Sequence, residues 1–167
     1  MENLLKFLKE RRSVRAFQDK NIPKEQLQEI VDVARFAPTA RNVQPWEFVV
    51  VTDKEKIAQL SDLGQNAKPL AGAAACIVVF CADSNYFLED GSAATCNILL
   101  AATALGIGSC WIAGDKKPYC QQVNALLAAP ANMKLISMIA LGYPQEENAF
   151  KITPKRELKE LLHWEKF

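Results

Sequence analysis

The chain has 167 residues, of which 50% are hydrophobic and 23% are charged, and its formal net charge is +1. This length and composition are typical of one globular domain spanning residues 1–167. The near-neutral charge and the lack of a block of like charges argue against binding to nucleic acid or to an anionic membrane. The sequence has neither a secretory signal nor an apolar run of about 18 residues, so we expect a cytoplasmic protein.

The cysteines and the single histidine limit the kinds of catalytic site that the chain can form. The five cysteines are odd in number, form no Cys-x-x-Cys motif, and mostly stand in apolar stretches, which predicts buried free thiols. One histidine, His163, gives little support to a zinc site or to a Ser-His-Asp triad. An enzyme built from this chain would therefore take its chemistry from a cofactor.

Hydrophobic periodicity predicts helices and strands along the whole chain. The predicted helices cover residues 2–10, a segment opened by Pro23 and ended by Pro38, 54–63, 90–105 and 119–128. The predicted strands cover residues 48–51, 75–81, 109–112 and 135–141. The helix at 90–105 is apolar nearly all round, so we expect it in the core or at a subunit interface.

The C-terminal segment differs from the rest of the chain. Residues 145–157 are polar, yet large apolar side chains follow them at Leu158, Leu161, Leu162, Trp164 and Phe167. Such side chains at a chain end must dock on something, either on their own domain or on a partner.

Three arginines and a serine gather in Arg11-Arg12-Ser13-Val14-Arg15, at the end of the first predicted helix. Guanidinium groups offer fork-shaped donors suited to phosphate, so this stretch could form a compact anion site. The alternative is a solvated basic turn that favours the C-terminal dipole of the helix. Composition alone favours this alternative.

The connection Ala37-Pro38-Thr39-Ala40-Arg41-Asn42-Val43-Gln44-Pro45-Trp46 is unusually polar for a link between a helix and a buried strand. Its prolines fix φ and remove amide donors, so the loop is stiffer than its length suggests. We interpret it as one wall of a flavin site.

The stretch Gly106-Ile107-Gly108-Ser109-Cys110-Trp111 is not a dinucleotide fingerprint, because here the glycines follow a helix and precede a strand. Its glycines would allow the backbone to approach a flat ligand closely. The alternative is a helix C-cap followed by a tight turn.

Taken together, these motifs resemble the signature of the FMN-dependent nitroreductase family. The Arg-Arg-Ser-Val-Arg stretch matches near the N-terminus, and the proline-rich loop is close to the family's Ala-Pro-Ser-x-x-Asn-x-Gln-Pro-Trp. Gly-Ile-Gly-Ser-Cys-Trp-Ile, Gly142-Tyr143-Pro144 and the terminal His163-Trp164-Glu165-Lys166-Phe167 match in order and spacing. The resemblance covers essentially the whole chain, which is short for the family.

The resemblance implies an α+β, three-layer fold, with a mixed or mostly antiparallel central sheet flanked by helices. It also implies an intertwined homodimer with an exchanged C-terminal tail and with FMN at the interface. The implied function is that of an FMN-dependent oxidoreductase. It would use NADH or NADPH to reduce a nitroaromatic, a quinone or a similar small electron acceptor by a ping-pong mechanism.

The resemblance further assigns cofactor-binding residues, and it implies no catalytic acid or base. It implies contacts to the phosphate, ribityl chain and pyrimidine edge of FMN for Arg11, Arg12, Ser13, Arg15 and Arg156. The loop of the other subunit would flank the isoalloxazine ring through Pro38, Thr39, Ala40 and Asn42. Backbone contacts are implied for Ile112, Ala113 and Gly114, and an amide near the flavin for Gln65 and Asn66. Arg15 would stabilise the negative charge of the reduced flavin.

Two other interpretations remain open from the sequence. The same fold serves reductive dehalogenation, flavin breakdown and dehydrogenation of peptide heterocycles, and the chain could also be an FMN-binding module without efficient turnover. The sequence shows neither an acid for reading a ribose nor an arginine for a 2′-phosphate, so it does not distinguish NADH from NADPH.

Overall fold

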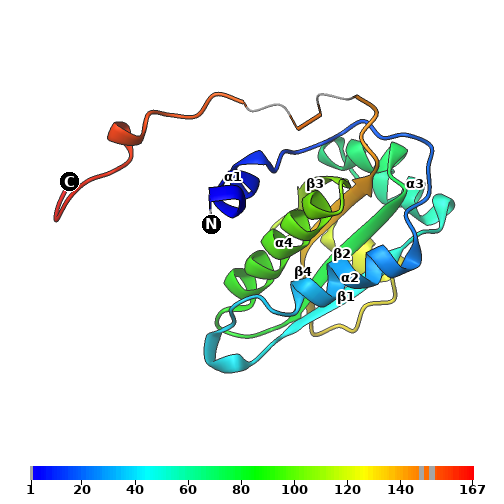
Figure 1. Cartoon of the computed structure of the whole chain (residues 1–167). Helices are drawn as coiled ribbons and strands as arrows, with labels where there is room; N and C mark the ends of the chain where they lie inside the picture. The colour runs from blue at the N-terminus through cyan, green and yellow to red at the C-terminus, as the bar shows by residue number, and fades with distance from the viewer. Residues whose placement is uncertain (1, 147–148, 151–152) are drawn as a thin grey trace.

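A four-stranded antiparallel sheet lies at the centre of the structure, a computed structural model that describes residues 2–146, 149–150 and 153–167. The strand order is β1-β2-β4-β3 (Figure 1). The strands are β1 (Trp46–Val51), β2 (Ala75–Ala82), β3 (Gly108–Ala113) and β4 (Met133–Gly142). The two middle strands, β2 and β4, are buried almost throughout, which explains their continuous apolar sequences.

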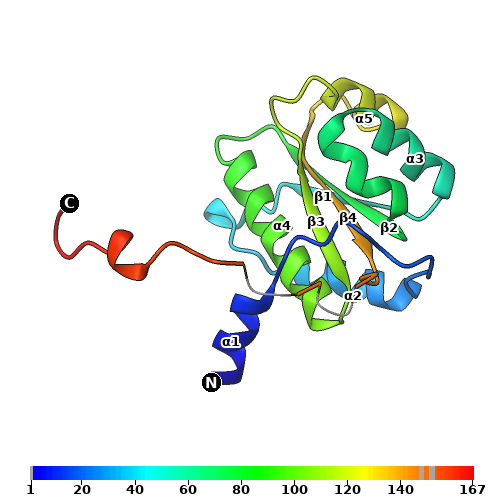
Figure 2. The same ribbon diagram turned by 90° about the horizontal axis from the view of Figure 1, so that it is seen from above.

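Helices cover both faces of this sheet. The helices α2 (Lys24–Ala34) and α4 (Phe87–Ala104) pack on one face. The other face is covered by α3 (Lys54–Asp62), the 3₁₀ segment η2 (Gln65–Gly72) and α5 (Cys120–Leu126). Figure 2 shows the strands between α4 on one side and α3 with α5 on the other. The predicted three-layer α+β fold is therefore confirmed, with every pairing between the named strands antiparallel.

Local sequence signals explain where several elements begin and end. Pro23 directly precedes α2, and Asp53 caps α3 by accepting a hydrogen bond from the Lys56 amide at 2.8 Å. The sequence did not predict η2, because Pro69 and the glycines around this segment interrupt any apolar period.

Residues 13–17 lie along the edge of β3 and the end of β4. Val14 N donates to Ser109 O at 2.9 Å, and Phe17 forms an isolated bridge with Pro144. A Cβ added at Gly108 would lie 2.8 Å from the Val14 Cβ, which is closer than real contacts allow. The close approach that we expected for a flat ligand at this glycine is thus made by Val14, while Gly106, with φ of 70°, ends the turn after α4.

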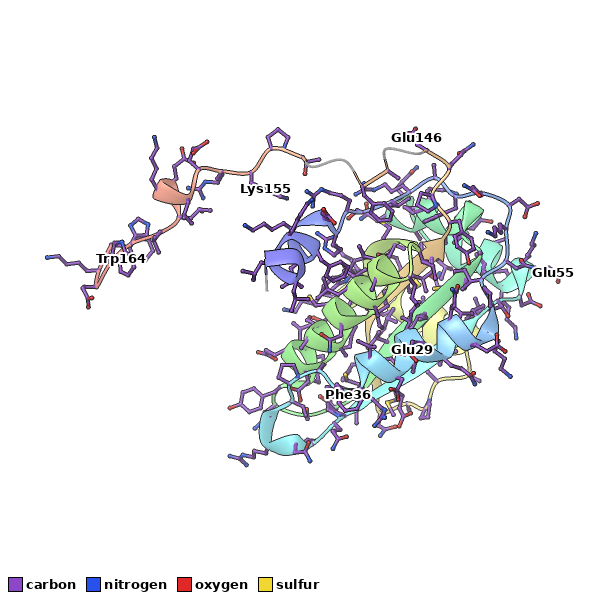
Figure 3. All side chains as sticks on the ribbon, viewed as in Figure 1. Glu29, Phe36, Glu55, Glu146, Lys155 and Trp164 are labelled. Atoms are coloured by element: carbon purple, nitrogen blue, oxygen red, sulfur yellow. The ribbon has the colours of Figure 1, made fainter. Side chains whose placement is uncertain are left out.

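The two ends of the chain project from this body (Figures 1 and 2). They are the helix α1 (Glu2–Glu10) and a C-terminal tail, residues 153–167, which contains the short 3₁₀ segment η3 (Leu158–Glu160). Figure 3 shows Lys155 and Trp164 on this tail, well away from the sheet. Trp164 is 77% exposed and Leu4 on α1 is 62% exposed, so neither end buries its apolar side chains in its own chain.

Candidate functional site

A cavity of about 570 Å³ lies along the outer edge of β3, opposite the edge that pairs with β4. Its volume lies within the range of small-molecule sites, about 300–1,000 Å³. The lining residues come from the segment before α2, from η2, from β3 and from the turn after it. They are Arg15, Gln65, Asn66, Lys68, Pro69, Cys110, Trp111, Ile112, Ala113 and Lys117.

The register of β3 determines which backbone groups face this cavity. Gly114 N donates to Ile136 O of β4 at 2.8 Å, whereas Ser109 O accepts from Val14 N on the outer side. Because successive residues of an antiparallel strand direct their N–H groups to opposite edges, those of Trp111 and Ala113 point outward. The edge strand therefore offers two backbone donors to whatever occupies the cavity.

The charged side chains that line the cavity are all cationic. They are Arg15, Lys68 and Lys117, and no aspartate or glutamate is among the described residues that line it. Lys68 forms an ion pair with Asp62 at 3.1 Å, and that carboxylate lies outside the lining. The cavity therefore favours an anionic or electron-rich ligand.

The turn that follows β3 is held by two side-chain donors. The Tyr119 hydroxyl donates to Ala113 O, and the Cys120 thiol donates to Gly114 O at 2.8 Å. Burial is the largest cause that raises the pKa values of both groups, so both stay protonated and able to donate near neutral pH. This turn fixes the end of β3 where Ala113 meets the cavity.

Cys110 lines the cavity but is not a nucleophile at neutral pH. Burial raises the pKa of its thiol, and the nearby charge of Arg15 lowers it by less. A thiol in this state is a small apolar wall rather than a reactive group.

The structure brings a part of the predicted site together in this cavity, namely Arg15, Asn66, Ile112 and Ala113, with Gln65 beside them. Gly114 follows directly but packs inward, since its amide bonds to β4 and an added Cβ would lie 2.7 Å from Leu135 Cγ.

Three further predicted residues, Arg11, Arg12 and Ser13, lead from α1 toward Arg15. Ser13 forms an isolated parallel bridge with Ser109 of β3. The Arg12 guanidinium donates to Lys9 O at 2.7 Å and to Arg11 O at 2.6 Å. These contacts keep Arg12 on the C-terminal end of α1.

The remaining predicted residues lie elsewhere in the chain. The loop with Pro38, Thr39, Ala40 and Asn42 lies near the start of α4 (Figure 1). There the Thr39 hydroxyl donates to Asp90 at 2.9 Å. Arg156 is on the projecting tail, where it forms an ion pair with Glu160 at 3.5 Å. A single chain therefore does not bring these residues to the cavity.

Sequence reasoning missed Lys68, Lys117 and Trp111 as residues that line the cavity. Lysines in a polar segment carry no pattern that separates them from a solvated surface, so only the position of Lys68 close to Asn66 could have indicated it. Trp111 stands in a predicted strand, and only its place on an edge strand exposes it to a ligand.

Two features are absent from the residues that the structure describes. Among them, no three histidine, cysteine or acidic side chains are grouped as a metal ion would require. In the same residues, every helix is too short or too polar to cross a bilayer.

The chain is similar to known proteins over its whole length. It matches the "Nitroreductase family" over residues 8–78 and "Putative TM nitroreductase" over residues 70–166. A protein of Archaeoglobus fulgidus, described as "Putative NADH dehydrogenase/NAD(P)H nitroreductase", is 39% identical to it, and the alignment covers 100% of both chains. The chain belongs to the nitroreductase family.

Other members of the family agree with this assignment. The "FMN reductase [NAD(P)H]" of Bacillus subtilis is 27% identical over 90% of this chain and 70% of its own. The solved "FMN-dependent Nitroreductase" of Clostridium difficile has a TM-score of 0.91 and 31% identity, covering 98% of this chain and 99% of its own. A "putative nitroreductase in complex with fmn" from Desulfovibrio desulfuricans has a TM-score of 0.82 and 29% identity, covering 98% and 97%.

Proposed function

We propose that this protein is an NAD(P)H-dependent FMN oxidoreductase and that its flavin binds in the cavity along β3. The observation that carries the proposal is the composition of this cavity. Outward N–H groups of Trp111 and Ala113, the Asn66 amide and cationic side chains without a carboxylate suit the polar, electron-rich edge of a flavin. The names of the family members support the same cofactor and the same reductants.

Each part of the site has a distinct task in this proposal. Asn66 and the β3 edge hold the rim of the ring, while Arg15 places a positive charge beside it. Arg11, Arg12, Ser13 and Arg156 hold the phosphate and the ribityl chain by charge-assisted hydrogen bonds. Gly114, whose own amide bonds to β4, keeps Ala113 in position.

When bound, FMN supplies the redox chemistry, because it can accept a hydride from NADH or NADPH and pass electrons on to an acceptor. The protein orients the reactants, and its positive charge at Arg15 favours the negative charge that reduction creates. The protonated Cys110 adds no negative charge to the wall of the cavity, and the protonated Tyr119 adds none to the turn beside it. The two substrates would use the same open face in turn, which gives a ping-pong mechanism.

The acceptor that we propose is a nitroaromatic, a quinone or a similar small electron-poor molecule. Its reduction requires stacking on the flavin face more than it requires a protein acid or base. A cavity surrounded by cations also accommodates acceptors that carry a negative charge.

We also propose that the active form is an intertwined homodimer in which each tail docks on the other subunit. The loop at Pro38–Asn42 lies outside the β3 cavity of its own chain, and a second subunit can supply it. Large exposed apolar side chains at both ends of the chain are suited to such an interface. They are Leu4, Leu5, Leu8, Leu158, Leu161, Leu162, Trp164 and Phe167.

Spectroscopy of the purified protein tests this proposal. The protein should be yellow, with flavin absorption near ~450 nm that bleaches when NADH or NADPH is added without oxygen. Addition of a nitroaromatic or a quinone should restore the colour, and a panel of acceptors then identifies the substrate class. A protein that stays colourless after incubation with FMN would contradict the proposal.

A further inference from the structure

A buried carboxylate at the start of α4 is the feature that the proposed function leaves unused. Asp90 is only 5% exposed, and it is the one buried side chain with a formal charge among the described residues. None of the ion pairs found in the described part of the chain includes it. Burying a charge without a cation is costly, so its hydrogen bonds must compensate.

Both hydrogen bonds to this carboxylate come from the loop between α2 and β1. The Thr39 hydroxyl donates to Oδ2 at 2.9 Å, and the Ala40 amide donates to Oδ1 at 3.1 Å. Thr39 Oγ1 in turn accepts from the amide of Gln44 at 3.1 Å. The Asp90 carboxylate therefore connects two consecutive loop residues, Thr39 and Ala40, to α4. Through Thr39 it is also linked to Gln44, at the end of the loop.

The loop needs such an anchor because its backbone is unfavourable. Arg41, Asn42 and Gln44 all have positive φ, at 55°, 57° and 52°, although none of them is glycine. Residues in this region are less stable than in ordinary conformations and persist only where the surroundings fix them. The amide of Gln44, which bonds to Thr39, belongs to one of these three residues.

The same contacts change the role expected for Thr39 and Ala40. The Thr39 hydroxyl proton and the Ala40 amide proton are both used by Asp90, so neither donor is available to a ligand. In this geometry Thr39 acts on the loop rather than on the flavin. The groups that remain for a ligand lie one or two residues further along, at Arg41 and Asn42.

We propose that Asp90 is a positioning residue that fixes the loop at residues 39–44 in the conformation that contacts the flavin, with Thr39 as its intermediary. This inference rests on the proposed function, because it assumes that the loop forms one wall of an FMN site. It adds that this wall depends on a carboxylate of α4, a helix that contributes no residue to the lining of the β3 cavity.

Substitution of either partner should loosen the loop in the flavin-free protein. Asp90→Asn keeps the shape, but its NH₂ group cannot accept a hydrogen bond, so one of the two loop donors loses its acceptor. Thr39→Val removes the hydroxyl at nearly constant volume, and with it both the bond to Asp90 and the acceptor of the Gln44 amide. By hydrogen exchange, we expect amides within residues 39–44 to exchange at least about ten-fold faster in either variant, as for loss of one charge-assisted hydrogen bond, and fastest in Thr39→Val.

The same variants should bind FMN at least about ten-fold more weakly in a fluorescence titration, since each breaks the bond between Thr39 and Asp90. The double variant should bind no more weakly than Thr39→Val alone, because Asp90→Asn breaks a bond that Thr39→Val has already removed. Thr39→Ser, which keeps the hydroxyl, should restore wild-type exchange and affinity. Glu89→Gln, an exposed carboxylate of the same helical turn, is the matched control and should change neither.

Two results would overturn the inference. In the first, Asp90→Asn lowers the unfolding midpoint but leaves loop exchange and FMN affinity of the folded protein unchanged, so Asp90 is only structural. In the second, the single variants weaken FMN binding additively, so Thr39 acts on the ligand by itself. A wild-type protein that binds no FMN would refute the proposed function and the positioning role together, which distinguishes that failure from the other two.

Discussion

The body around the sheet and the two ends of the chain differ in how far their apolar side chains are exposed. In β2 and β4, residues such as Ile77 and Leu141 are fully buried, whereas Leu158 is 70% exposed and Phe167 is fully exposed. The body thus buries its apolar side chains within one chain, whereas the ends leave theirs exposed to solvent. This difference supports the proposed dimer, in which the ends pack against a second copy.

The residues of the candidate site are likewise divided between the body and parts of the chain that lie away from the cavity. The β3 cavity with Arg15 and Asn66 is complete within the body. Arg156 lies on the exposed tail, and the Pro38–Asn42 loop lies outside the cavity. If the ends and the loop complete their contacts in a dimer, cofactor binding and subunit association depend on each other.

The largest expected effect is on the stability of the body, tested by a matched pair of leucines. Leu141→Ala removes a fully buried side chain between the layers and should cost about 2–5 kcal/mol in the free energy of unfolding. Leu158→Ala, at 70% exposure in its own chain, should change the unfolding of the monomer by less than about 0.5 kcal/mol. Urea unfolding monitored by circular dichroism at several protein concentrations measures both, because a loss that comes from the proposed dimer depends on concentration. Equal losses that do not depend on concentration would mean that the tail packs on its own body in solution.

A second pair of variants compares an arginine of the body with one of the tail. Arg15→Ala and Arg156→Ala should each weaken FMN binding by about 1.5–3 kcal/mol, since each removes a charge-assisted hydrogen bond to the cofactor. Titration of the flavin-free protein with FMN measures the change. Arg35→Ala is the control, because Arg35 pairs with Asp32 on the surface of α2. Unchanged affinity for Arg156→Ala would leave the tail without a role in the site.

A smaller effect is the pH dependence of stability, which should differ between a buried thiol and an exposed one. Burial raises the pKa of Cys76 from 9.0 to about 12, so this thiol stays neutral in the folded state. Above pH 9 this thiol ionises in the unfolded chain, while it stays protonated in the folded protein. Stability should therefore fall between pH 9 and pH 12, by up to about 1.4 kcal/mol per pH unit for this group.

Urea midpoints measured between pH 8 and pH 10.5 test this dependence. Cys76→Ala should reduce the slope and leave the part that comes from Cys81, because burial raises the pKa of that thiol to about 12 as well. Cys96→Ala, which replaces an exposed thiol, should leave the slope unchanged. A slope that is the same in all three proteins would show that other groups govern the alkaline loss of stability.

The sequence predicted the layers of the fold because periodicity and end signals are local. The helix predicted over residues 54–63 and the apolar strand predicted over residues 75–81 are each indicated by neighbouring residues, and the structure has both as α3 and β2. The parts that were missed depend on contacts across the chain. Gly108 makes room for Val14, and the contact between Thr39 and Asp90 joins residues 51 positions apart.

The residues of the candidate site also fall into those that the sequence indicated and those that only the folded chain brings together. Arg15 and Asn66 could be proposed because they stand in motifs that resemble the family's, and the structure places both at one cavity. Lys68 and Lys117 belong to no motif, and only the packing of η2 and of the turn after β3 brings them to the same wall.

We propose that two subunits share each flavin site, and dimers mixed from two differently defective subunits distinguish a shared site from an unshared one. One subunit carries Arg15→Ala in the cavity, and the other carries Thr39→Val with Asn42→Ala in the loop. Each variant alone should form dimers that bind FMN weakly. Different affinity tags allow the mixed dimer to be isolated from a co-expression of the two.

In the mixed dimer, a shared site would combine the intact cavity of one subunit with the intact loop of the other. We therefore expect recovery of one tightly bound FMN per mixed dimer, with wild-type affinity at that site. If each loop served the cavity of its own chain, both sites would stay defective. A mixed dimer that binds FMN no better than the two parent variants would contradict the account.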